Sequence, residues 1–283
     1  MKKSDYLKTK IFLDSGDPEE TRKAFLLLGF LDGQTTNPSL IAKNPQAQEQ
    51  LSKGKKFSHD EVYNFYQNVI KEIYQIIPKG SISIEVYADR ETTVEAMLKQ
   101  ALTLNSWIPN AHIKLPITTT GLNVAEILVK KGVNVNMTLC FSQQQAAAVY
   151  SATKGAKKGQ VFVSPFIGRL DDRGINGLDL IKNCLKMYEN GDGHVEVLVA
   201  SIRSLNHLLV SFALKADIIT VPFAILKDWK ENKDFKGQVN NLLPVEYEEL
   251  DLSKPWTQFD IFHQLTDIGI DKFCADWNQL IKR

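Results

Sequence analysis

The sequence predicts an α/β fold: a single-domain (β/α)8 barrel with a C-terminal helical extension. Short runs rich in β-branched and aromatic residues alternate with longer stretches of helical periodicity along most of the 283 residues. About eight such runs occur, which is the number that closes a barrel. No Pro/Ser-rich linker, charge block or internal repeat divides the chain, so we expect residues 1–283 to form one domain.

The expected elements follow one another in a regular βα order. The expected strands are residues 10–14, 29–33, 82–87, 111–115, 133–138, 161–164, 195–201 and 217–221. The expected helices are residues 17–28, 60–77, 92–104, 121–131, 142–151, 175–189 and 204–214. Residues 227–283 should comprise an irregular segment, 227–256, and an amphipathic helix within 258–282 that packs on the barrel or on a neighbouring subunit.

Charge and cysteine content exclude several classes of partner. Lysine and arginine total 34 against 33 aspartate and glutamate, so the net charge of +1 gives no general attraction to nucleic acid or to an anionic membrane. No apolar run reaches membrane-spanning length, and the apolar run at 11–13 is too short for a signal peptide. Cys140, Cys184 and Cys274 are odd in number and widely spaced, which favours a reducing cytoplasm.

Polar residues recur at the C-terminal ends of the expected strands, where catalytic groups of parallel barrels gather. Side chains alternate along a strand, and in each run the apolar residues of one parity face the helices. The other parity points polar side chains into the barrel, namely Asp14, Glu85, His112, Lys114, Asn134, Asn136 and Thr138. Ser164 and Ser201, which end two later strands, extend the set.

Lys114 is the most informative of these residues. It interrupts an otherwise apolar strand, where burial disfavours the charged ammonium. A neutral amine can attack a ketone or aldehyde to form an imine, whose positive nitrogen draws electrons from a neighbouring carbon–carbon bond. For a lone strand lysine, a structural role with the amine at the rim is the commoner case. The other inward polar groups favour the catalytic interpretation.

Two carboxylates accompany the lysine. Asp14 and Glu85 can supply the proton transfers that imine formation and bond cleavage require. Each also has a structural alternative: Asp14 can belong to a turn ahead of the helix cap at Asp17, and Glu85 can pair with Arg90.

Arg169 and Arg203 follow the ends of two late strands and suggest an anion site. A guanidinium suits a phosphate, and helix N-termini after late strands commonly add backbone N–H donors. A single strand-end arginine is more often part of a surface salt bridge, so the inference depends on the equivalent positions of the two. The histidines lack metal-ligand spacing. We therefore expect neither a metal nor a cofactor.

Several motifs resemble the transaldolase family over about residues 11–225. They are Phe12-Leu-Asp14-Ser, Thr35-Thr-Asn37-Pro-Ser-Leu, Ile113-Lys114-Leu-Pro, Asn136-Met-Thr138-Leu, Ser164-Pro-Phe166-Ile-Gly-Arg169-Leu-Asp-Asp and Ala200-Ser201-Ile-Arg203. The resemblance implies a (β/α)8 barrel with the Schiff-base lysine on the fourth strand. This agrees with the position of Lys114 counted from the strands.

The resemblance also implies a role for each matching residue. Lys114 would form the imine, Asp14 would be the acid/base for the sugar hydroxyl, and Glu85 with Thr138 would hold the catalytic water. The remaining matches would bind substrate: Thr35, Asn37, Asn136 and Ser164 around the dihydroxyacetone unit, and Arg169, Ser201 and Arg203 at the phosphate.

Two activities occur in this family, and Phe166 and Glu85 bear on the choice. Fructose 6-phosphate aldolases typically carry tyrosine and glutamine at these positions, whereas this chain is similar to the transaldolases. The resemblance thus implies transfer of dihydroxyacetone from sedoheptulose 7-phosphate or fructose 6-phosphate to glyceraldehyde 3-phosphate or erythrose 4-phosphate, in the pentose phosphate pathway. The alternatives are an aldolase that releases dihydroxyacetone and a non-catalytic sugar-phosphate-binding barrel.

The chain departs from the family in length. Extra sequence occurs around 44–78, 152–159 and 227–256, and it leaves acceptor preference and subunit number open. The ending, with His263, Phe273 and Trp277, resembles a compact subfamily whose C-terminal helix often packs on a neighbouring subunit. We therefore expect a homo-oligomer.

Overall fold

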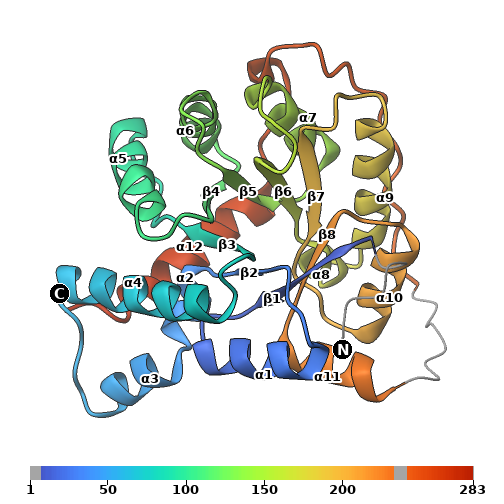
Figure 1. The fold of residues 1–283 in the computed structure, drawn as a ribbon. Coiled ribbons are helices and arrows are strands. Elements are labelled where there is room, and N and C mark those ends of the chain that lie inside the picture. Colours follow the sequence, from blue (N-terminus) through green and yellow to red (C-terminus); the bar gives the residue numbers. More distant parts are fainter. Residues whose placement is uncertain (1–7, 233–240, 283) are drawn as a thin grey trace.

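A closed barrel of parallel strands forms the centre of the molecule (Figure 1). The computed structural model describes residues 8–232 and 241–282. The strands are β1 (Lys10–Asp14), β2 (Gly33–Thr35), β3 (Ser81–Glu85), β4 (Ala111–Pro116), β5 (Val135–Cys140), β6 (Val161–Pro165), β7 (Val195–Val199) and β8 (Ile218–Val221). They pair in sequence order, and β8 closes on β1, with Phe12 opposite Thr220. The predicted (β/α)8 barrel is thereby confirmed.

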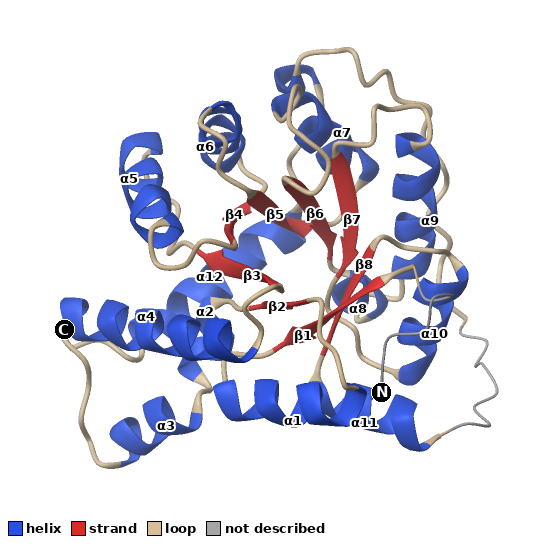
Figure 2. Cartoon of the chain, viewed as in Figure 1, coloured by secondary structure: helices blue, strands red, loops and turns tan. Residues whose placement is uncertain are grey.

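Helices alternate with the strands and surround the barrel (Figure 2). They are α1 (Pro18–Leu28), α2 (Pro38–Ala42), α3 (Pro45–Ser52), α4 (His59–Ile76), α5 (Val94–Asn105), α6 (Thr119–Lys130), α7 (Gln143–Ala152), α8 (Ile167–Asp171), α9 (Gly177–Tyr188), α10 (Leu205–Ala213), α11 (Phe223–Glu231) and α12 (Gln264–Asn278). A 3-10 turn, η1, covers Trp256–Gln258. The long predicted helices all form, with ends within a few residues of those expected.

Local signals set where the helices begin. The Asp17 side chain accepts the N–H of Glu19, with Pro18 in the first turn of α1, as the sequence predicts. Ser58 and Glu61 form a reciprocal capping box at the start of α4. These caps satisfy N–H groups that a helix cannot pair internally.

The prediction of the second strand was wrong. Residues 29–33 were expected, but β2 is Gly33–Thr35, because Gly29 adopts a φ of 78° and terminates α1 instead. The short helices α2, α3 and α8 were not predicted. Helix α11 also runs to Glu231, inside the segment 227–256 that was expected to be irregular, and residues 233–240 of that segment lie outside the described residues.

The C-terminal helix packs on its own barrel. Helix α12 lies against α2 and the end of β5, and the Thr266 hydroxyl donates to the Leu139 carbonyl at 2.9 Å. Leu265, Phe273 and Trp277 on this helix are buried. The helix therefore contributes to the C-terminal face of the barrel, where the strands end.

Apolar and aromatic side chains fill the N-terminal end of the barrel. The rings of His112 and Phe162 stack with centroids 4.1 Å apart, and Phe12 meets Phe162 edge-on at 6.0 Å. Lys10 pairs with Glu196 beside them at 2.9 Å. These rings and the ion pair occupy the N-terminal end of the barrel interior among the described residues.

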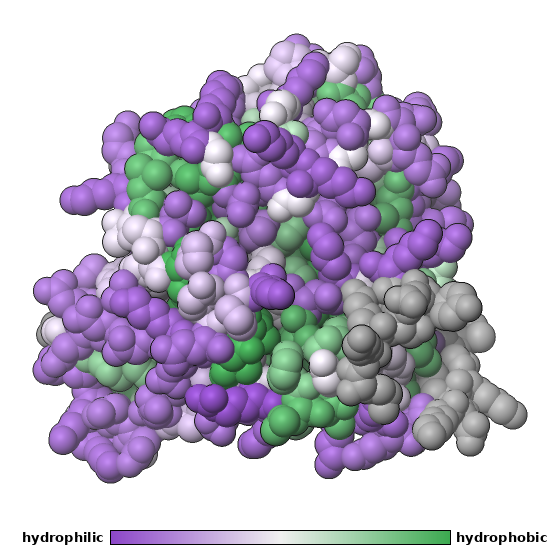
Figure 3. Space-filling view, in the orientation of Figure 1, coloured by the Kyte–Doolittle hydropathy of each residue, from purple (hydrophilic) through white to green (hydrophobic). Residues whose placement is uncertain are grey.

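Hydrophilic side chains cover most of the face drawn in Figure 3, and hydrophobic ones gather in smaller areas between them. Among the described helices, none combines the length and apolar character needed to cross a bilayer.

Candidate active site

A cavity of about 600 Å³ opens at the C-terminal ends of the strands. Several elements contribute polar side chains to its wall. They include Asp14 and Thr35 from β1 and β2, Lys114 from β4, Ser164 from β6, Thr220 from β8, and Asn37, Arg169, Ser201 and Arg203 from the segments that follow strands. The structure thus brings together most of the residues that the sequence analysis selected.

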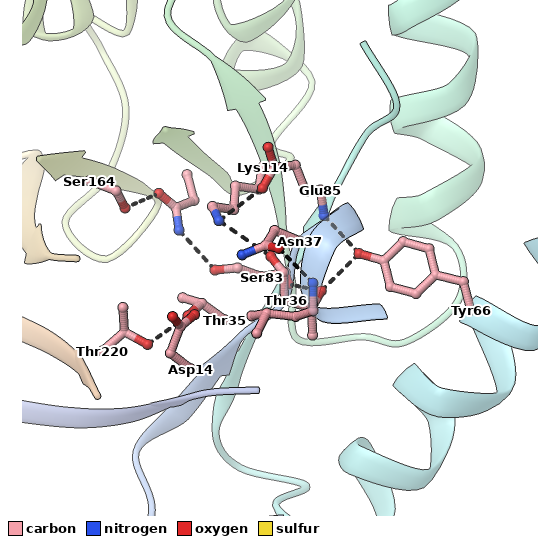
Figure 4. Close-up of polar contacts among 12 residues, drawn as sticks. Asp14, Thr35, Thr36, Asn37, Tyr66, Ser83, Glu85, Lys114, Ser164 and Thr220 are labelled. Atoms are coloured by element: carbon pink, nitrogen blue, oxygen red, sulfur yellow. Dashed lines mark hydrogen bonds and ion pairs between the residues drawn. The ribbon is translucent and has the colours of Figure 1, made fainter. Parts of the chain in front are cut away.

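Lys114 and Glu85 form a buried ion pair within this site. They lie side by side in the register of β4 and β3, with Lys114 Nζ 2.9 Å from Glu85 Oε2. Each side chain is only 3% exposed. Lys114 Nζ also donates to the Thr36 carbonyl at 3.3 Å (Figure 4). The alternative pairing of Glu85 with Arg90 is wrong, because Arg90 binds Asp271 on the surface at 2.6 Å.

Burial shifts both site carboxyls towards their neutral forms. Desolvation raises the pKa of Glu85, opposed by the positive charge of Lys114. Desolvation also raises the pKa of Asp14, opposed by Lys114 and by a hydrogen bond from Thr35. A carboxyl with a raised pKa can hold a proton transiently, so each group is suited to acid/base work.

Asp14 lies inside the barrel, away from the turn that was its structural alternative. Its carboxylate accepts the Thr35 hydroxyl at 2.7 Å, and the Thr35 oxygen lies 2.6 Å from that of Thr220 (Figure 4). Because the Thr35 proton goes to Asp14, Thr220 donates to Thr35. This relay from β8 through β2 to β1 fixes the carboxylate.

A second chain of hydrogen bonds crosses the barrel from β6 to β3. The Ser164 hydroxyl donates to Asn136 Oδ1 at 2.6 Å, and Asn136 Nδ2 donates to Ser83 Oγ at 3.0 Å. Asn37 caps α2 by accepting the N–H of Leu40 at 2.8 Å. Ser164 and Asn37 both line the cavity, where they can hydrogen-bond the hydroxyls of a sugar.

Thr138 is fully buried on β5, opposite Pro116 of β4. Its hydroxyl oxygen contacts no hydrogen-bonding partner within residues 8–232 and 241–282. It is absent from the wall of the 600 Å³ cavity. A buried hydroxyl without a protein partner is a natural position for a bound water.

Arg169 is held between two aromatic rings. Its guanidinium carbon lies 5.3 Å from the ring centroids of both Phe166 and Phe273. Gly269 permits this arrangement, because an added Cβ there would lie 2.7 Å from Arg169 Nη1. That Nη1 atom is buried and meets no acceptor in the described part of the chain. Arg169 is thus preorganised to bind an anion, and it forms no salt bridge with a carboxylate of residues 8–232 or 241–282.

Arg203 lies at the rim of the cavity. Its side chain is 53% exposed and Nη2 is 3.2 Å from Asp172 Oδ2, so this arginine does form a surface ion pair. Ser201 adopts a left-handed backbone with φ of 61°. Gly168 packs against this segment, since a Cβ there would lie 2.2 Å from the Ser201 carbonyl oxygen. This close packing holds the segment that places Ser201 and Arg203 in the cavity wall.

The sequence analysis missed several site residues. Period-two alternation would have found Ser83, two residues before Glu85, and Thr220 within its short strand. Lys43, Arg173 and Lys272 also line the cavity and make its wall richer in positive charge. These three lie after the short helices or on α12, where no strand alternation marks them. The described residues contain no group of three or more His, Cys, Asp or Glu side chains that could hold a metal ion.

Comparisons with known proteins give one consistent result. The family model described as "Transaldolase/Fructose-6-phosphate aldolase" matches residues 11–283. The chain is 37% identical to a probable transaldolase of Brucella ovis over 268 residues, which are 95% of this chain and 96% of the relative. It is 36% identical to one of Anaeromyxobacter sp. over 97% of this chain and 100% of the relative. It is 42% identical to a probable transaldolase of Brucella melitensis biotype 1 over 268 residues, which are 95% of this chain and 96% of the relative.

Proposed function

We propose that this chain, which belongs to the transaldolase/fructose-6-phosphate aldolase family, acts as a transaldolase of the pentose phosphate pathway with Lys114 as its Schiff-base nucleophile. Its nearly full-length similarity to probable transaldolases supports this activity. The chief support is the buried amine of Lys114, which lies 2.9 Å from the Glu85 carboxylate. Lys114 also lines the cavity, together with Asp14 and arginines.

The first step is imine formation. Glu85 takes a proton from Lys114, leaving a neutral amine and a neutral acid; burial raises the pKa of Glu85 and so favours its protonated form. The amine attacks the ketose carbonyl to give a carbinolamine, Glu85 returns its proton to the carbinolamine hydroxyl, and loss of water gives the iminium. Glu85 and Thr138 hold the water that is released here and consumed later. Asn37, Asn136 and Ser164 bind the hydroxyls of the dihydroxyacetone unit.

Carbon–carbon cleavage follows. Asp14 removes the proton of the hydroxyl next to the breaking bond, the hydroxyl carbon becomes an aldehyde, and the bonding electrons pass to the iminium to give an enamine. An aldose phosphate leaves and another enters. The enamine then attacks the incoming aldehyde, Asp14 returns its proton, and water releases the new ketose from Lys114.

The phosphate of both donor and acceptor would occupy the same positive end of the cavity. Arg169, Ser201 and Arg203 provide the donors there, with Arg169 preorganised by its two rings. A shared phosphate site suits exchange, because both ketoses and both aldoses of this reaction carry a terminal phosphate. The substrates are therefore sugar phosphates, with sedoheptulose 7-phosphate or fructose 6-phosphate as donor.

Phe166 favours transfer over simple aldol cleavage. The centroid of its ring is 5.8 Å from Lys114 Nζ. The ring carries no hydroxyl that could help to protonate the enamine. The enamine therefore survives until an aldehyde arrives. We expect Phe166→Tyr to increase release of free dihydroxyacetone in the absence of acceptor. An unchanged release rate would show that Phe166 does not favour transfer.

Three broader expectations go with this function. Residues 1–283 would act as one domain, and the enzyme would be a homo-oligomer in the cytoplasm. Cys140, Cys184 and Cys274 are free thiols, as a reducing compartment would keep them.

Borohydride trapping tests the assignment of the lysine. The enzyme is incubated with fructose 6-phosphate and reduced, and its peptides are weighed by mass spectrometry. A dihydroxyacetone-sized adduct on the peptide that contains Lys114 is expected, and it should be absent from Lys114→Ala. An adduct on another lysine would overturn the assignment, and product analysis with and without erythrose 4-phosphate separates transfer from release.

A further inference from the structure

Tyr66 lies on α4, outside the barrel, yet its side chain reaches between the ends of β2 and β3 (Figure 4). It is 1% exposed and does not line the substrate cavity. We propose that Tyr66 is a positioning residue for the Lys114 amine, acting through Thr36 and Glu85. The inference rests on the proposed function of Lys114.

The hydrogen bonds of Tyr66 have one consistent direction. The Glu85 backbone N–H donates to Tyr66 Oη at 3.0 Å, and Tyr66 Oη lies 2.8 Å from Thr36 Oγ1. The Thr36 hydroxyl donates to the Ser83 carbonyl at 2.8 Å, and a carbonyl can only accept. Since the single Thr36 proton is used there, Tyr66 must donate to Thr36. The chain therefore runs from Glu85 through Tyr66 and Thr36 to Ser83.

This chain holds the residues that contact the amine. Lys114 Nζ contacts the Glu85 carboxylate at 2.9 Å and the Thr36 carbonyl at 3.3 Å. Tyr66 binds the backbone of the first residue and the side chain of the second. One hydroxyl thus fixes both groups around the nucleophile without touching it. Attack on a carbonyl requires close alignment, so a small displacement of these groups slows the reaction.

The Tyr66 ring is anchored separately from its hydroxyl. It meets Trp107 edge-on at 5.4 Å and Trp277 at 5.7 Å. Burial raises the pKa of the hydroxyl, so it remains a donor across the working pH range. A phenylalanine at this position would keep the ring contacts and remove only the hydroxyl, which makes the substitution a clean test.

The test compares Tyr66→Phe with a matched control. We expect kcat for dihydroxyacetone transfer to fall about 10- to 100-fold, because the amine is misaligned, while KM for fructose 6-phosphate stays within about twofold. The rate of borohydride-trapped adduct formation should fall with kcat. The control is Tyr63→Phe, one turn earlier on α4: its hydroxyl accepts from Gln100 and its ring also packs on Trp277, at 5.6 Å, but it does not reach the strand ends. It should behave as wild type.

Thr36→Val breaks the same chain at its next link and should reduce kcat similarly. The double variant with Tyr66→Phe should be no slower than the slower single variant, because both remove one network. A kcat of Tyr66→Phe equal to that of Tyr63→Phe would overturn the proposal. So would a double variant whose fold-loss of kcat equals the product of the losses in Tyr66→Phe and Thr36→Val. If circular dichroism shows Tyr66→Phe unfolded, Thr36→Val alone decides.

The wild-type adduct separates this inference from the proposed function. An adduct on a lysine other than Lys114 in the wild type would mean that the function assigned to Lys114 fails. An adduct on Lys114 that forms equally fast in wild type and Tyr66→Phe would refute only the positioning role.

Discussion

Each end of the barrel holds a lysine–glutamate ion pair, and the two pairs have the same separation of 2.9 Å. At the N-terminal end Lys10 meets Glu196, and the lysine side chain is 41% exposed. At the C-terminal end Lys114 meets Glu85, and both side chains are 3% exposed. Water screens the first pair and is excluded from the second. The same two groups therefore form a screened ion pair at one end and, under the proposed function, the reactive pair at the other.

The surroundings of the two pairs come from the same strands. Three strands place an aromatic or imidazole ring near the N-terminal end of the barrel, which we call the lower layer. Two residues later each places a polar group near the C-terminal end, which we call the upper layer. The couples are Phe12 with Asp14, His112 with Lys114, and Phe162 with Ser164. A two-residue step along a strand thus separates packing from chemistry. The comparison predicts that substitutions in the lower layer change stability and those in the upper layer change activity.

Lys114→Met should have the largest effect. Without the amine no imine can form, so the rate of dihydroxyacetone transfer should fall by roughly 10⁴-fold or more. The pKa of Glu85, which burial already raises, should rise further, since Lys114 lowers it through its charge and its hydrogen bond. Coupled-enzyme assays of glyceraldehyde 3-phosphate exchange measure the loss. Residual transfer above about 1% of wild type would mean that another group carries the chemistry.

Phe162→Ala should show the complementary effect in the lower layer. The ring is 2% exposed and packs on His112 and Phe12, so its removal should lower the free energy of unfolding by about 3–5 kcal/mol. Urea unfolding followed by circular dichroism measures this loss. The kcat of the folded fraction should stay within about threefold of wild type. A specific loss of kcat would show that the two layers are not separable.

Phe273→Leu should affect the proposed phosphate site alone. Removing one ring from Arg169 costs a cation–π contact, so KM for fructose 6-phosphate should rise about 5- to 10-fold. Steady-state kinetics measure the change, and Phe262→Leu, at a 71% exposed position, is the control. An equal rise of KM for an unphosphorylated ketose would show that Arg169 is not the group affected.

Thr35→Val should shift the pH dependence of activity. Asp14 must be ionised to take the hydroxyl proton, so kcat/KM falls as pH falls through its pKa, which burial raises above the usual value. The Thr35 hydrogen bond stabilises the ionised form and lowers that pKa. Its loss should therefore move the acidic limb to higher pH. Thr103→Val, at an exposed position on α5, should leave the limb in place.

These effects also separate what the sequence could and could not predict. Strand alternation places Asp14, Glu85 and Lys114 inward, because the period of two is imposed by the backbone itself. Glu85 and Lys114 are then neighbours through the order of the strands. The same alternation did not locate β2, because the apolar residues after Gly29 follow a helix end and resemble a strand.

Contacts between distant elements could not be read from the pattern. Arg169 meets Phe273 only because α12 returns across the C-terminal face of the barrel, and its path depends on packing against α2 and β5. Helical periodicity shows that Tyr66 faces inward, but it does not show which atoms the hydroxyl meets. The residues that support the chemistry are therefore harder to predict than those that perform it.

Lys10→Met should have the smallest effect and is the direct counterpart of Lys114→Met. The lysine is 41% exposed, so loss of its pairing with Glu196 should cost at most about 1 kcal/mol of unfolding free energy after solvent screening. Salt should reduce this difference further, because exposed pairs are screened. Urea unfolding at low and high ionic strength measures both. A larger or salt-independent loss, or a change in kcat, would mean that burial does not distinguish the two pairs.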